Sequence, residues 1–499
     1  MKDKSEFLVF MAFCAIIIAA SIVRLSSLDE PGFTCDEITY VKAGINYILY
    51  SDFEYNVEHP PLAKYLIGLS VLVFGQTEFG ARSLIAVLGT LTCVVVFFLA
   101  RELYDEYTAL FGSALLALST YHIAHSRVAT LDAPLTFFYT LTIFFFWKGL
   151  KDRKYLWLSG ITLGLSIATK YPGVYLYIIL AVYLILFERL ISYKNGVISI
   201  NINKDLLVAM FLSVGVFILV APFLFFQLTS AADVSVPLIA KSIYRNLRHL
   251  QAGHSNYFMG EITNAPPPWF YIVYLIYRPT IPMVILFSLG IAYALYRRSK
   301  PDILLLLWIF IPLACFSFSK VKLLHYLVPI FPPLCVLAAR GGAGIISFLR
   351  SKIKRRICLL AVLILIVWQS LVVYSAHPYY LLYFNELAGG TAGGARYFTV
   401  GWGEGLREAA YYVESHTSPN DKIVSWYSHI VSFYCQREVL PFPKSLEEIR
   451  NNNVKYAIVY LNQLQRYPNN PVIRYLSNLQ PEKIIYLRGI PLVWIYKIS

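Results

Sequence analysis

The chain has 499 residues, of which 58% are hydrophobic and only 14% are charged, and its mean hydropathy is +0.58. Soluble proteins carry about 25% charged residues, so this composition excludes an ordinary soluble domain. The net charge of +14 sits mostly in short loops between apolar runs, which argues against nucleic acid as a partner. The seven cysteines have no CxxC spacing, so they support neither a zinc site nor a disulfide framework.

Apolar runs long enough to cross a bilayer as helices recur along the chain. With the N-terminus in the cytoplasm, the basic loops around Lys151–Lys154, Arg297-Arg298 and Lys352–Arg356 stay inside, as the positive-inside rule requires. The sequence therefore predicts an all-α multi-pass protein of the cell membrane, with residues 1–375 as its transmembrane domain. About eleven spans are predicted, at residues 7–25, 80–100, 107–121, 133–150, 155–170, 172–188, 206–226, 270–296, 302–318, 323–340 and 357–375.

Three long segments are predicted on the extracytoplasmic side. Residues 27–79 contain two amphipathic helices that lie in the membrane interface, at 36–50 and 62–74, and the second follows Pro60-Pro61. Residues 227–269 form a second outer loop. The less apolar residues 376–499 are predicted to form a small soluble α/β domain outside the cell, with a helix at 446–451 and strand-like runs at 422–427, 455–461 and 493–497.

An acidic pair, Asp36-Glu37, opens the first interfacial helix. Adjacent helical residues point about 100° apart, so only one of the two can face a given site. The pair is either an acidic first turn that the helix dipole stabilises or a catalytic carboxylate that accepts a proton from a hydroxyl as a general base. Asp36 and Glu37 are therefore the candidate catalytic residues.

Polar side chains of the two outer loops are candidates for substrate binding. Glu58, His59 and Lys64 surround a rigid proline corner, although a helix start with a snorkelling lysine would also explain them. His254 lies in the second outer loop. Together with Glu58 and His59 it could hold a divalent ion, but no local ligand spacing supports a metal site.

Two further candidates for substrate binding lie next to spans. Asp132 is either a substrate ligand or the N-cap of the next helix, with Arg127 as its ion-pair partner. Tyr326 follows a short basic segment between two spans. Aromatic residues at such places are also common as belt residues at the membrane interface.

Cations at the ends of apolar segments form a candidate phosphate site. Arg127 and Lys170 lie between spans with little loop around them, and ionisable groups at the edge of the hydrocarbon usually mark a site. Lys322 and Arg278 extend the set on the same side, although lysines that reach toward lipid headgroups would explain part of it. A polyprenyl-phosphate sugar would suit this face, because lysine and arginine stabilise the charge that its phosphate gains on leaving.

Several of these stretches together resemble the phospholipid-carrier-dependent glycosyltransferases of the GT-C fold. The nearest group is the protein O-mannosyltransferase-like family with its prokaryotic relatives, which include the aminoarabinose transferases of lipid A. The resemblance covers about residues 30–340. It rests on Asp36-Glu37, on His-Pro-Pro-Leu-Ala-Lys at 59–64, on residues 127–132, on Gly-Leu-Ser-Ile-Ala-Thr-Lys-Tyr at 164–171 and on residues 322–333, and stretches at 385–390 and 401–404 are also similar.

The resemblance implies a GT-C fold, Asp36 as the catalytic base, and Arg127 and Lys170, with Lys322 and Arg278, around the lipid phosphate. The loop 227–269 is too short for the lumenal β-trefoil of eukaryotic members, and the Trp-Trp-Asp motif of oligosaccharyltransferases is missing from the sequence. The acceptor therefore does not follow from the resemblance.

The leading hypothesis is an inverting glycosyltransferase with its active site outside the cell. It would move mannose or a related hexose or pentose from a polyprenyl- or dolichyl-phosphate carrier to a hydroxyl or amine of a protein, lipid or glycan. No cofactor is expected to be required, although a divalent cation remains possible on the residues named above. The alternatives are a transporter or flippase of lipid-linked sugars and a non-catalytic glycan-binding membrane protein.

Overall fold

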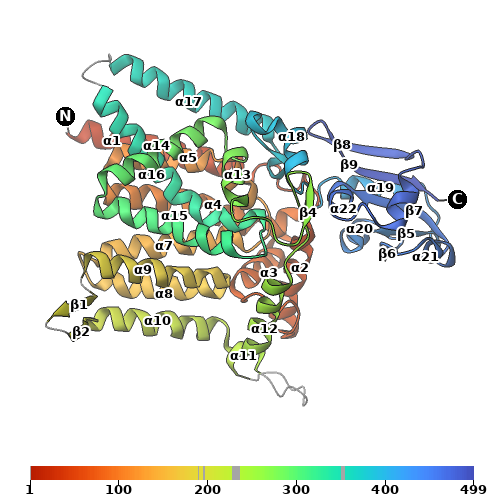
Figure 1. The fold of residues 1–499 in the computed structure, drawn as a ribbon, viewed down its shortest axis with the longest axis horizontal. Helices are drawn as coiled ribbons and strands as arrows, with labels where there is room; N and C mark the ends of the chain where they lie inside the picture. The colour runs from red at the N-terminus through yellow and green to blue at the C-terminus, as the bar shows by residue number, and fades with distance from the viewer. Residues whose placement is uncertain (1, 189, 195–196, 227–236, 350–354, 499) are drawn as a thin grey trace.

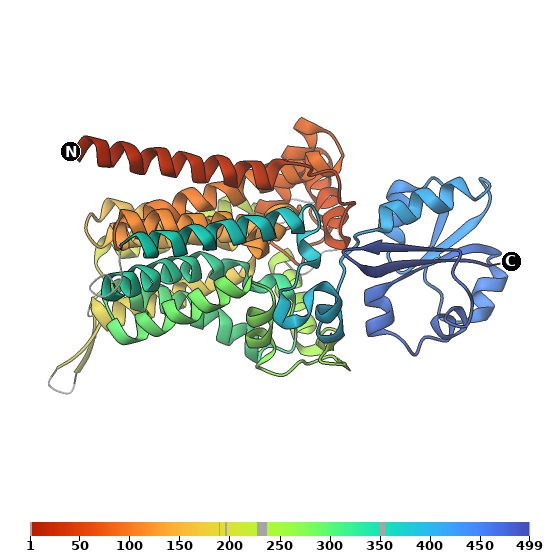
Figure 2. The same cartoon turned by 90° about the horizontal axis from the view of Figure 1, so that it is seen from above.

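The computed structural model describes residues 2–188, 190–194, 197–226, 237–349 and 355–498. It consists of a bundle of long helices and a smaller domain with a β-sheet that lies beyond one end of the bundle (Figure 1). The N-terminus lies at the opposite end of the bundle, and the C-terminus lies in the sheet domain (Figure 2). Of the predicted outer loop, residues 227–236 lie outside the described residues.

A helix is present over every predicted span. Residues 270–296 form two helices rather than one, because Arg278–Thr280 separate them. The helices are α1 (Lys2–Leu25), α4 (Glu78–Leu103), α5 (Glu106–Ala117), α7 (Asp132–Gly149), α8 (Lys154–Thr169), α9 (Tyr175–Phe187), α10 (Lys204–Val220), α13 (Phe270–Tyr277), α14 (Ile281–Arg297), α15 (Lys300–Phe318), α16 (Phe331–Leu349) and α17 (Arg355–Ala376).

Several of these helices suit a bilayer, and the protein is a multi-pass membrane protein. By length and apolar composition, four described segments are able to cross a membrane: Glu6–Leu25, Glu78–Leu103, Lys300–Phe318 and Leu324–Gly344. The other apolar helices of the bundle are shorter, such as Ile281–Arg297. The count of eleven crossings therefore stays a prediction.

The charged loops gather at one end of the bundle, as the sequence predicts for the cytoplasmic loops. Ion pairs join Arg153 to Asp205 over 3.7 Å and Lys300 to Glu188 over 3.2 Å. The hairpin of β1 (Ile191–Lys194) and β2 (Val197–Ile200) projects from the same end (Figure 1), which we call the hairpin end. The opposite end, next to the sheet domain, is called the domain end.

Short elements cover the domain end, among them both predicted interfacial helices. The first is α2 (Cys35–Ile45), continued by the π-helical turn η1 (Asn46–Tyr50), and the second is α3 (Leu62–Phe74). They cross where Gly44 meets Gly68, and a Cβ on Gly44 would lie 2.4 Å from the carbonyl oxygen of Lys64. The remaining elements are α6 (Thr120–Ser126), η2 (Tyr171–Val174), α11 (Pro222–Phe225), α12 (Leu238–Ala252), β3 (Asn256–Phe258), β4 (Glu261–Thr263) and η3 (Leu324–Ile330).

The C-terminal domain has a five-stranded sheet in the order β6-β5-β7-β9-β8, with helices on both faces (Figure 2). Strands β6, β5 and β7 are parallel, and β7, β9 and β8 are antiparallel. The three predicted strands and the predicted helix are confirmed, whereas the two edge strands were not predicted. The strands are β5 (Lys422–Ser425), β6 (Glu438–Pro441), β7 (Val454–Tyr460), β8 (Lys483–Leu487) and β9 (Ile490–Lys497), and the helices are α19 (Leu406–Ser415), α20 (Ser428–Tyr434), α21 (Leu446–Asn451), α22 (Leu461–Arg466) and α23 (Pro471–Leu476).

Residues 377–400 connect the two parts and pack on the bundle. They contain η4 (Tyr380–Leu382), η5 (Glu386–Ala388) and α18 (Gly390–Tyr397). The Asn385 side-chain amide donates to the carbonyl oxygens of Ile276 and Pro279, both at 2.7 Å. Phe398 forms an antiparallel bridge with Phe258 at the end of β3. The sheet domain is thus held close to the domain end.

Candidate active site

Asp36 is a half-buried carboxylate at the start of α2. The Glu37 carboxylate accepts from the backbone N–H of Thr34 over 2.7 Å and so caps this helix start. Within the described residues, no hydrogen bond or ion pair engages the Asp36 carboxylate. Burial raises its pKa to about 6, the nearby ammonium of Lys170 lowers it, and the carboxylates of Asp132 and Glu37 raise it. The group is therefore ionised at neutral pH and free to accept a proton.

Lys170 and Asp132 form a buried ion pair close to Asp36. Lys170 follows the last residue of α8, Asp132 is the first residue of α7, and Nζ lies 2.7 Å from Oδ1. The Lys170 ammonium also lies 5.0 Å from the ring centroid of Tyr326. Two alternatives for Asp132 are corrected: the N-cap of α7 is Leu131, and the ion-pair partner is Lys170 rather than Arg127.

A cavity of about 1250 Å³, including its open mouth, lies between the domain end of the bundle and the C-terminal domain. Asp36 lies in its wall, so the unpartnered carboxylate faces space that a substrate can occupy. The bundle contributes His125, His254, Arg278 and His325, and the C-terminal part contributes Trp402, Glu404, Trp426, Tyr427, Asn462 and Arg466. Two parts of the chain far apart in sequence thus build one cavity.

Arg278 and His254 are the predicted residues that share this cavity with Asp36. The Arg278 guanidinium donates to the carbonyl oxygens of Leu381 and Tyr383, while its buried Nε has no partner among the described residues. His254 Nε2 lies 3.2 Å from the guanidinium of Arg466. Burial, followed by the Arg466 charge, lowers the pKa of His254 to about 4, so this imidazole is neutral at physiological pH.

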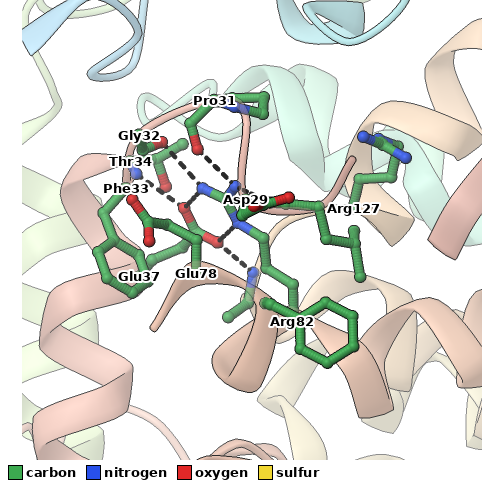
Figure 3. A network of polar contacts seen from close by, with 12 residues as sticks. Asp29, Pro31, Gly32, Phe33, Thr34, Glu37, Glu78, Arg82 and Arg127 are labelled. Atoms are coloured by element: carbon green, nitrogen blue, oxygen red, sulfur yellow. Dashed lines mark hydrogen bonds and ion pairs between the residues drawn. The ribbon is translucent and has the colours of Figure 1, made fainter. Parts of the chain in front are cut away.

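Glu37 is a structural residue, which corrects its prediction as a catalytic carboxylate. Its side chain is fully buried and forms an ion pair with Arg82, with 2.6 Å from Oε1 to Nε (Figure 3). Oε1 also accepts from the backbone N–H of Ala129, and Oε2 accepts from that of Thr34, both at 2.7 Å. Its strong acceptor positions are occupied, so Glu37 has no capacity left to act as a base.

Arg82 holds the loop that precedes Asp36, and this residue was not among the predicted site residues. Besides Glu37, its guanidinium donates to the carbonyl oxygens of Leu28, Pro31 and Gly32 (Figure 3). The sequence signal that could have revealed this role is an arginine inside the apolar helix α4, because an ionisable group within a span usually has a specific partner.

The C-terminal domain contacts the same loop. The Tyr434 hydroxyl lies 2.7 Å from the backbone nitrogen of Phe33 and 2.5 Å from a carboxylate oxygen of Glu78. Arg407 donates to the carbonyl oxygens of Asp29 and Glu30. The backbone nitrogen of Cys35 donates to the carbonyl oxygen of Trp402 over 2.8 Å. The position of Asp36 is thus supported from two sides.

The Arg127 guanidinium is engaged at the end of α1, so its predicted role as a ligand of the donor phosphate gains no support from the geometry. Its guanidinium donates to the carbonyl oxygens of Val23, Arg24, Ser26 and Ser27 and so caps the C-terminal end of α1. Figure 3 shows its side chain apart from the Arg82 network. A helix C-terminus favours a cation, because its last carbonyl groups lack partners within the helix.

Lys322 is buried between α15 and η3, and its Nζ donates to the carbonyl oxygen of Ser319 over 2.5 Å. It is not among the residues that line the cavity around Asp36. Its predicted role at the donor phosphate stays a prediction.

Lys64 is also structural, which corrects its prediction as a substrate ligand. Its buried ammonium donates to the carbonyl oxygens of Asn56 and His59 and to the hydroxyl of Tyr47, at 2.5, 2.6 and 3.0 Å. These three bonds join the proline corner to η1 and to the start of α3. Burial lowers the pKa of Lys64 to about 7.

The proposed metal ligands are not brought together. Glu58 pairs with Arg245 of α12 over 2.7 Å, and His254 contacts Arg466 instead. The His59 ring is near Tyr40 on α2, and burial, followed by the charge of Lys170, lowers its pKa. In the part of the chain that the structure describes, no three histidine, cysteine, aspartate or glutamate side chains are grouped closely enough to hold a metal ion.

Comparison with known proteins confirms the resemblance drawn from the sequence. Residues 58–225 match the sequence model of a family described as dolichyl-phosphate-mannose-protein mannosyltransferase. An undecaprenyl phosphate-alpha-4-amino-4-deoxy-L-arabinose arabinosyl transferase of Pseudomonas fluorescens is 26% identical over 288 residues, which cover 56% of this chain and 49% of the relative. An uncharacterized protein of Aquifex aeolicus is 24% identical over 322 residues, covering 64% and 58%. The chain thus spans about half the length of the curated relatives it matches.

Solved structures show that the fold is of the GT-C type. ArnT from Cupriavidus metallidurans in the apo state matches with a TM-score of 0.58 and 16% identity, over 99% of this chain and 98% of that chain. The same protein bound to undecaprenyl phosphate gives 0.56, with 15% identity and 97% of both chains. The oligosaccharyltransferase AglB of Archaeoglobus fulgidus, in complex with an inhibitory peptide and a dolichol-phosphate, gives 0.57 and 13% identity, over 94% and 72%.

Proposed function

We propose that this GT-C protein transfers a sugar, with inversion, from a polyprenyl-phosphate carrier to an acceptor hydroxyl or amine on the extracytoplasmic face, where the cavity and the C-terminal domain lie. The observation that carries the proposal is the state of Asp36. It is a carboxylate with no partner in the described part of the chain, it lines a large cavity, and the charges of Lys170 and Asp132 act on it.

The arrangement suits a single displacement. Asp36 accepts the proton of the acceptor hydroxyl while the oxygen of that hydroxyl attacks the anomeric carbon of the donor sugar. The bond from that carbon to the phosphate oxygen breaks, and the polyprenyl phosphate leaves with one more negative charge. Attack opposite the leaving group inverts the anomeric configuration. Lys170, a buried cation whose charge acts on Asp36, is proposed to stabilise the departing phosphate.

The carriers in the two ligand-bound relatives support a polyprenyl phosphate as the donor's lipid. A nucleotide sugar is not normally available outside the cell, whereas a lipid carrier delivers its phosphate at the membrane interface. The sugar is proposed to be mannose or a related hexose or pentose, in line with the family description and the aminoarabinose relatives. A transporter is less well supported, because substrate sites of that class lie near the bilayer midplane, whereas this cavity lies at the domain end.

Transfer by the purified full-length protein in nanodiscs tests the proposal directly. Undecaprenyl-phosphate mannose and undecaprenyl-phosphate aminoarabinose, each radiolabelled in the sugar, are incubated with candidate acceptors. General-base catalysis contributes about 10²- to 10⁴-fold, so Asp36→Asn is expected to lower turnover by about 10³-fold. The control is Asp29→Asn, an exposed carboxylate of the same loop, which should keep its activity. Near-normal turnover of Asp36→Asn would refute the role of this base.

The stability of the same variant gives an independent readout. Because the folded pKa of Asp36 lies above that of a free aspartate, folding takes up a proton between about pH 4 and 6, and stability falls as pH rises through this window. Asparagine removes the buried charge. Asp36→Asn is therefore expected to melt at the same or a higher temperature at pH 7, so that its loss of activity is not a loss of fold.

A further inference from the structure

The cavity next to Asp36 is rich in polar groups that lack partners within the described structure. Five lining residues each carry at least one buried nitrogen or oxygen with no hydrogen-bond partner. Unpaired buried polar atoms are costly, and in native structures each calls for an explanation, such as an ordered water or ion or a functional role. The atoms are both ring nitrogens of His125, Nε of Arg278, Oε1 of Glu404, Oδ1 of Asn462 and Nε of Arg466.

Two tryptophans add aromatic surface to the same cavity. The Trp402 ring stacks on His325, with 5.2 Å between centroids and 8° between planes. The Trp426 ring stacks on Tyr467, with 4.5 Å between centroids. Both indoles are half-buried and line the cavity. Aromatic rings held by a neighbour offer a rigid apolar surface beside polar groups, a combination that suits a sugar ring, with its C–H face and its hydroxyls.

The cavity continues into a second hollow on the C-terminal domain. That hollow measures about 1260 Å³ with its open side and is lined by residues of β6, α22 and the following loop. Trp426 and Arg466 line both spaces and so mark the passage between them. Two asparagines, Asn469 and Asn470, and the exposed Lys444 line the outer part. An elongated ligand can thus reach from Asp36 to the surface of the C-terminal domain.

The position of Asp36 separates this space from the donor. Asp36 belongs to the cavity wall, whereas Lys170 and Asp132 are not among its lining residues. A general base must lie within hydrogen-bond reach of the hydroxyl that it deprotonates. The acceptor is therefore expected in the cavity, and the donor phosphate on the side of Lys170.

Building on the proposed transferase function, we infer that the acceptor is a carbohydrate chain whose reacting hydroxyl lies at Asp36 and whose outer sugars pass between Trp426 and Arg466 onto the C-terminal domain. A peptide acceptor is less well matched, because an extended peptide binds mainly through backbone bonds to a strand edge. The cavity offers side-chain groups instead, and the β6 residue that lines the outer hollow is Pro441, which has no N–H to donate.

Binding to the full-length protein in nanodiscs tests the inference without requiring turnover. The probes are a printed array of oligosaccharides of two to six mannose, glucose, galactose or N-acetylglucosamine units, with serine- and threonine-containing peptides beside them. The protein is the Asp36→Asn variant, which cannot consume an acceptor. Oligosaccharides are expected to bind, and Trp426→Ala and Arg466→Gln in this background are each expected to weaken binding at least tenfold. The control is Arg450→Gln, an exposed arginine on α21, which should leave binding unchanged.

The outcomes separate this inference from the transferase proposal. Binding of peptides but no oligosaccharide, or equal oligosaccharide binding by both cavity variants, overturns the carbohydrate acceptor, even if sugar transfer is observed. Oligosaccharide binding that depends on Trp426 and Arg466 supports the carbohydrate site. If such binding is observed but no donor is turned over in the transfer assay, only the transferase proposal fails. Half-buried Trp426 and Arg466 were chosen because neither belongs to the buried core, so the variants are expected to fold.

Discussion

Two buried groups of charges lie side by side at the domain end, and they differ in how completely they are paired. Around Arg82, the carboxylate of Glu37 accepts from a guanidinium and two backbone N–H groups, and the guanidinium donates to three further carbonyls. Around Lys170, only Asp132 is paired, and Asp36 has no partner within the described chain. The adjacent residues Asp36 and Glu37 thus have opposite roles.

The difference shows that a charged group withdrawn from water can serve either the fold or the reaction. A buried ion whose hydrogen bonds are all formed holds its surroundings in place and has little capacity to bind anything else. A buried carboxylate without partners is costly to the fold, and such perturbed groups cluster at functional sites. Glu37 is fully buried and Asp36 is half-buried, so exposure and the count of hydrogen bonds both distinguish the two carboxylates.

The largest expected effect on stability comes from the paired group. Glu37→Gln leaves the buried Arg82 without its compensating charge, and breaking such a pair costs about 3–5 kcal/mol. The loss of stability is measured as a lower melting temperature of the protein in detergent. The matched control is Glu106→Gln, which breaks an exposed pair with Arg101 that is worth about 0–1 kcal/mol. Equal melting of the two variants would contradict the structural role of Glu37.

The unpaired group should respond in activity and in its pH dependence. The wild-type rate is expected to fall as pH drops below about 6, because Asp36 must be deprotonated to act as a base. This fall in rate is the acid limb of the pH–rate profile. The Lys170 charge lowers the pKa of Asp36, so Lys170→Gln is expected to move the acid limb to higher pH. The same variant should lower turnover by about 10²-fold, since it loses a cation that stabilises the leaving phosphate.

A pH–rate profile of kcat/KM measures both effects of Lys170→Gln. Lys322→Gln is the matched control, because that lysine is also buried but is not among the charged groups that shift the pKa of Asp36. Its acid limb is expected to stay where it is in the wild type. An unchanged limb in Lys170→Gln would show that this ammonium does not act on the base.

Arg127 extends the comparison to a cation that is paired only with carbonyl groups. Arg127→Gln removes charged hydrogen bonds at the end of α1, and a bond of this kind contributes about 1.5–3 kcal/mol. A lower melting temperature is expected, with the acid limb of the activity unchanged. A shifted limb with normal melting would instead place Arg127 at the site.

The smallest expected effect is that of chelation. Lysine and arginine side chains supply the positive charge that transferases of nucleotide sugars take from a metal ion, so turnover in EDTA is expected to equal turnover without it. Zinc or manganese that restores an EDTA-inhibited enzyme would contradict this expectation. His254→Ala would then be expected to reproduce the loss.

The sequence was sufficient for most of the helices and for three strands of the C-terminal sheet. Apolar periodicity predicted the spans, the interfacial helices α2 and α3, and strands β5, β7 and β9. It missed the edge strands β6 and β8, because short strands with few inward-facing side chains have weak patterns. The basic loops near Lys151–Lys154 and Arg297-Arg298 lie at the hairpin end, as predicted, whereas residues 352–354 of the third basic loop lie outside the described residues.

The pairing of charges could not be read from the sequence. Asp132 and Arg127 are close in the chain, yet Lys170, two helices away from Arg127, is the residue that reaches Asp132. Local spacing favours the near neighbour, whereas the direction of a side chain at a helix end is decided by tertiary packing. For the same reason Lys64 looked like a substrate ligand, although it bonds to backbone carbonyls of its own loop.

The contact between Phe33 and Tyr434 joins residues that are 401 positions apart, and this separation bears on how the protein is made. The ribosome releases the segment that carries Asp36 long before α20. The sheet that supports α20 is finished later still, because β9 pairs with β7 inside the sheet and follows α20 in the chain. Domains that emerge first usually fold first. The nascent bundle can therefore insert into the membrane while the segment before its candidate base is still unsecured, and that segment gains its last support only after β9 has been made.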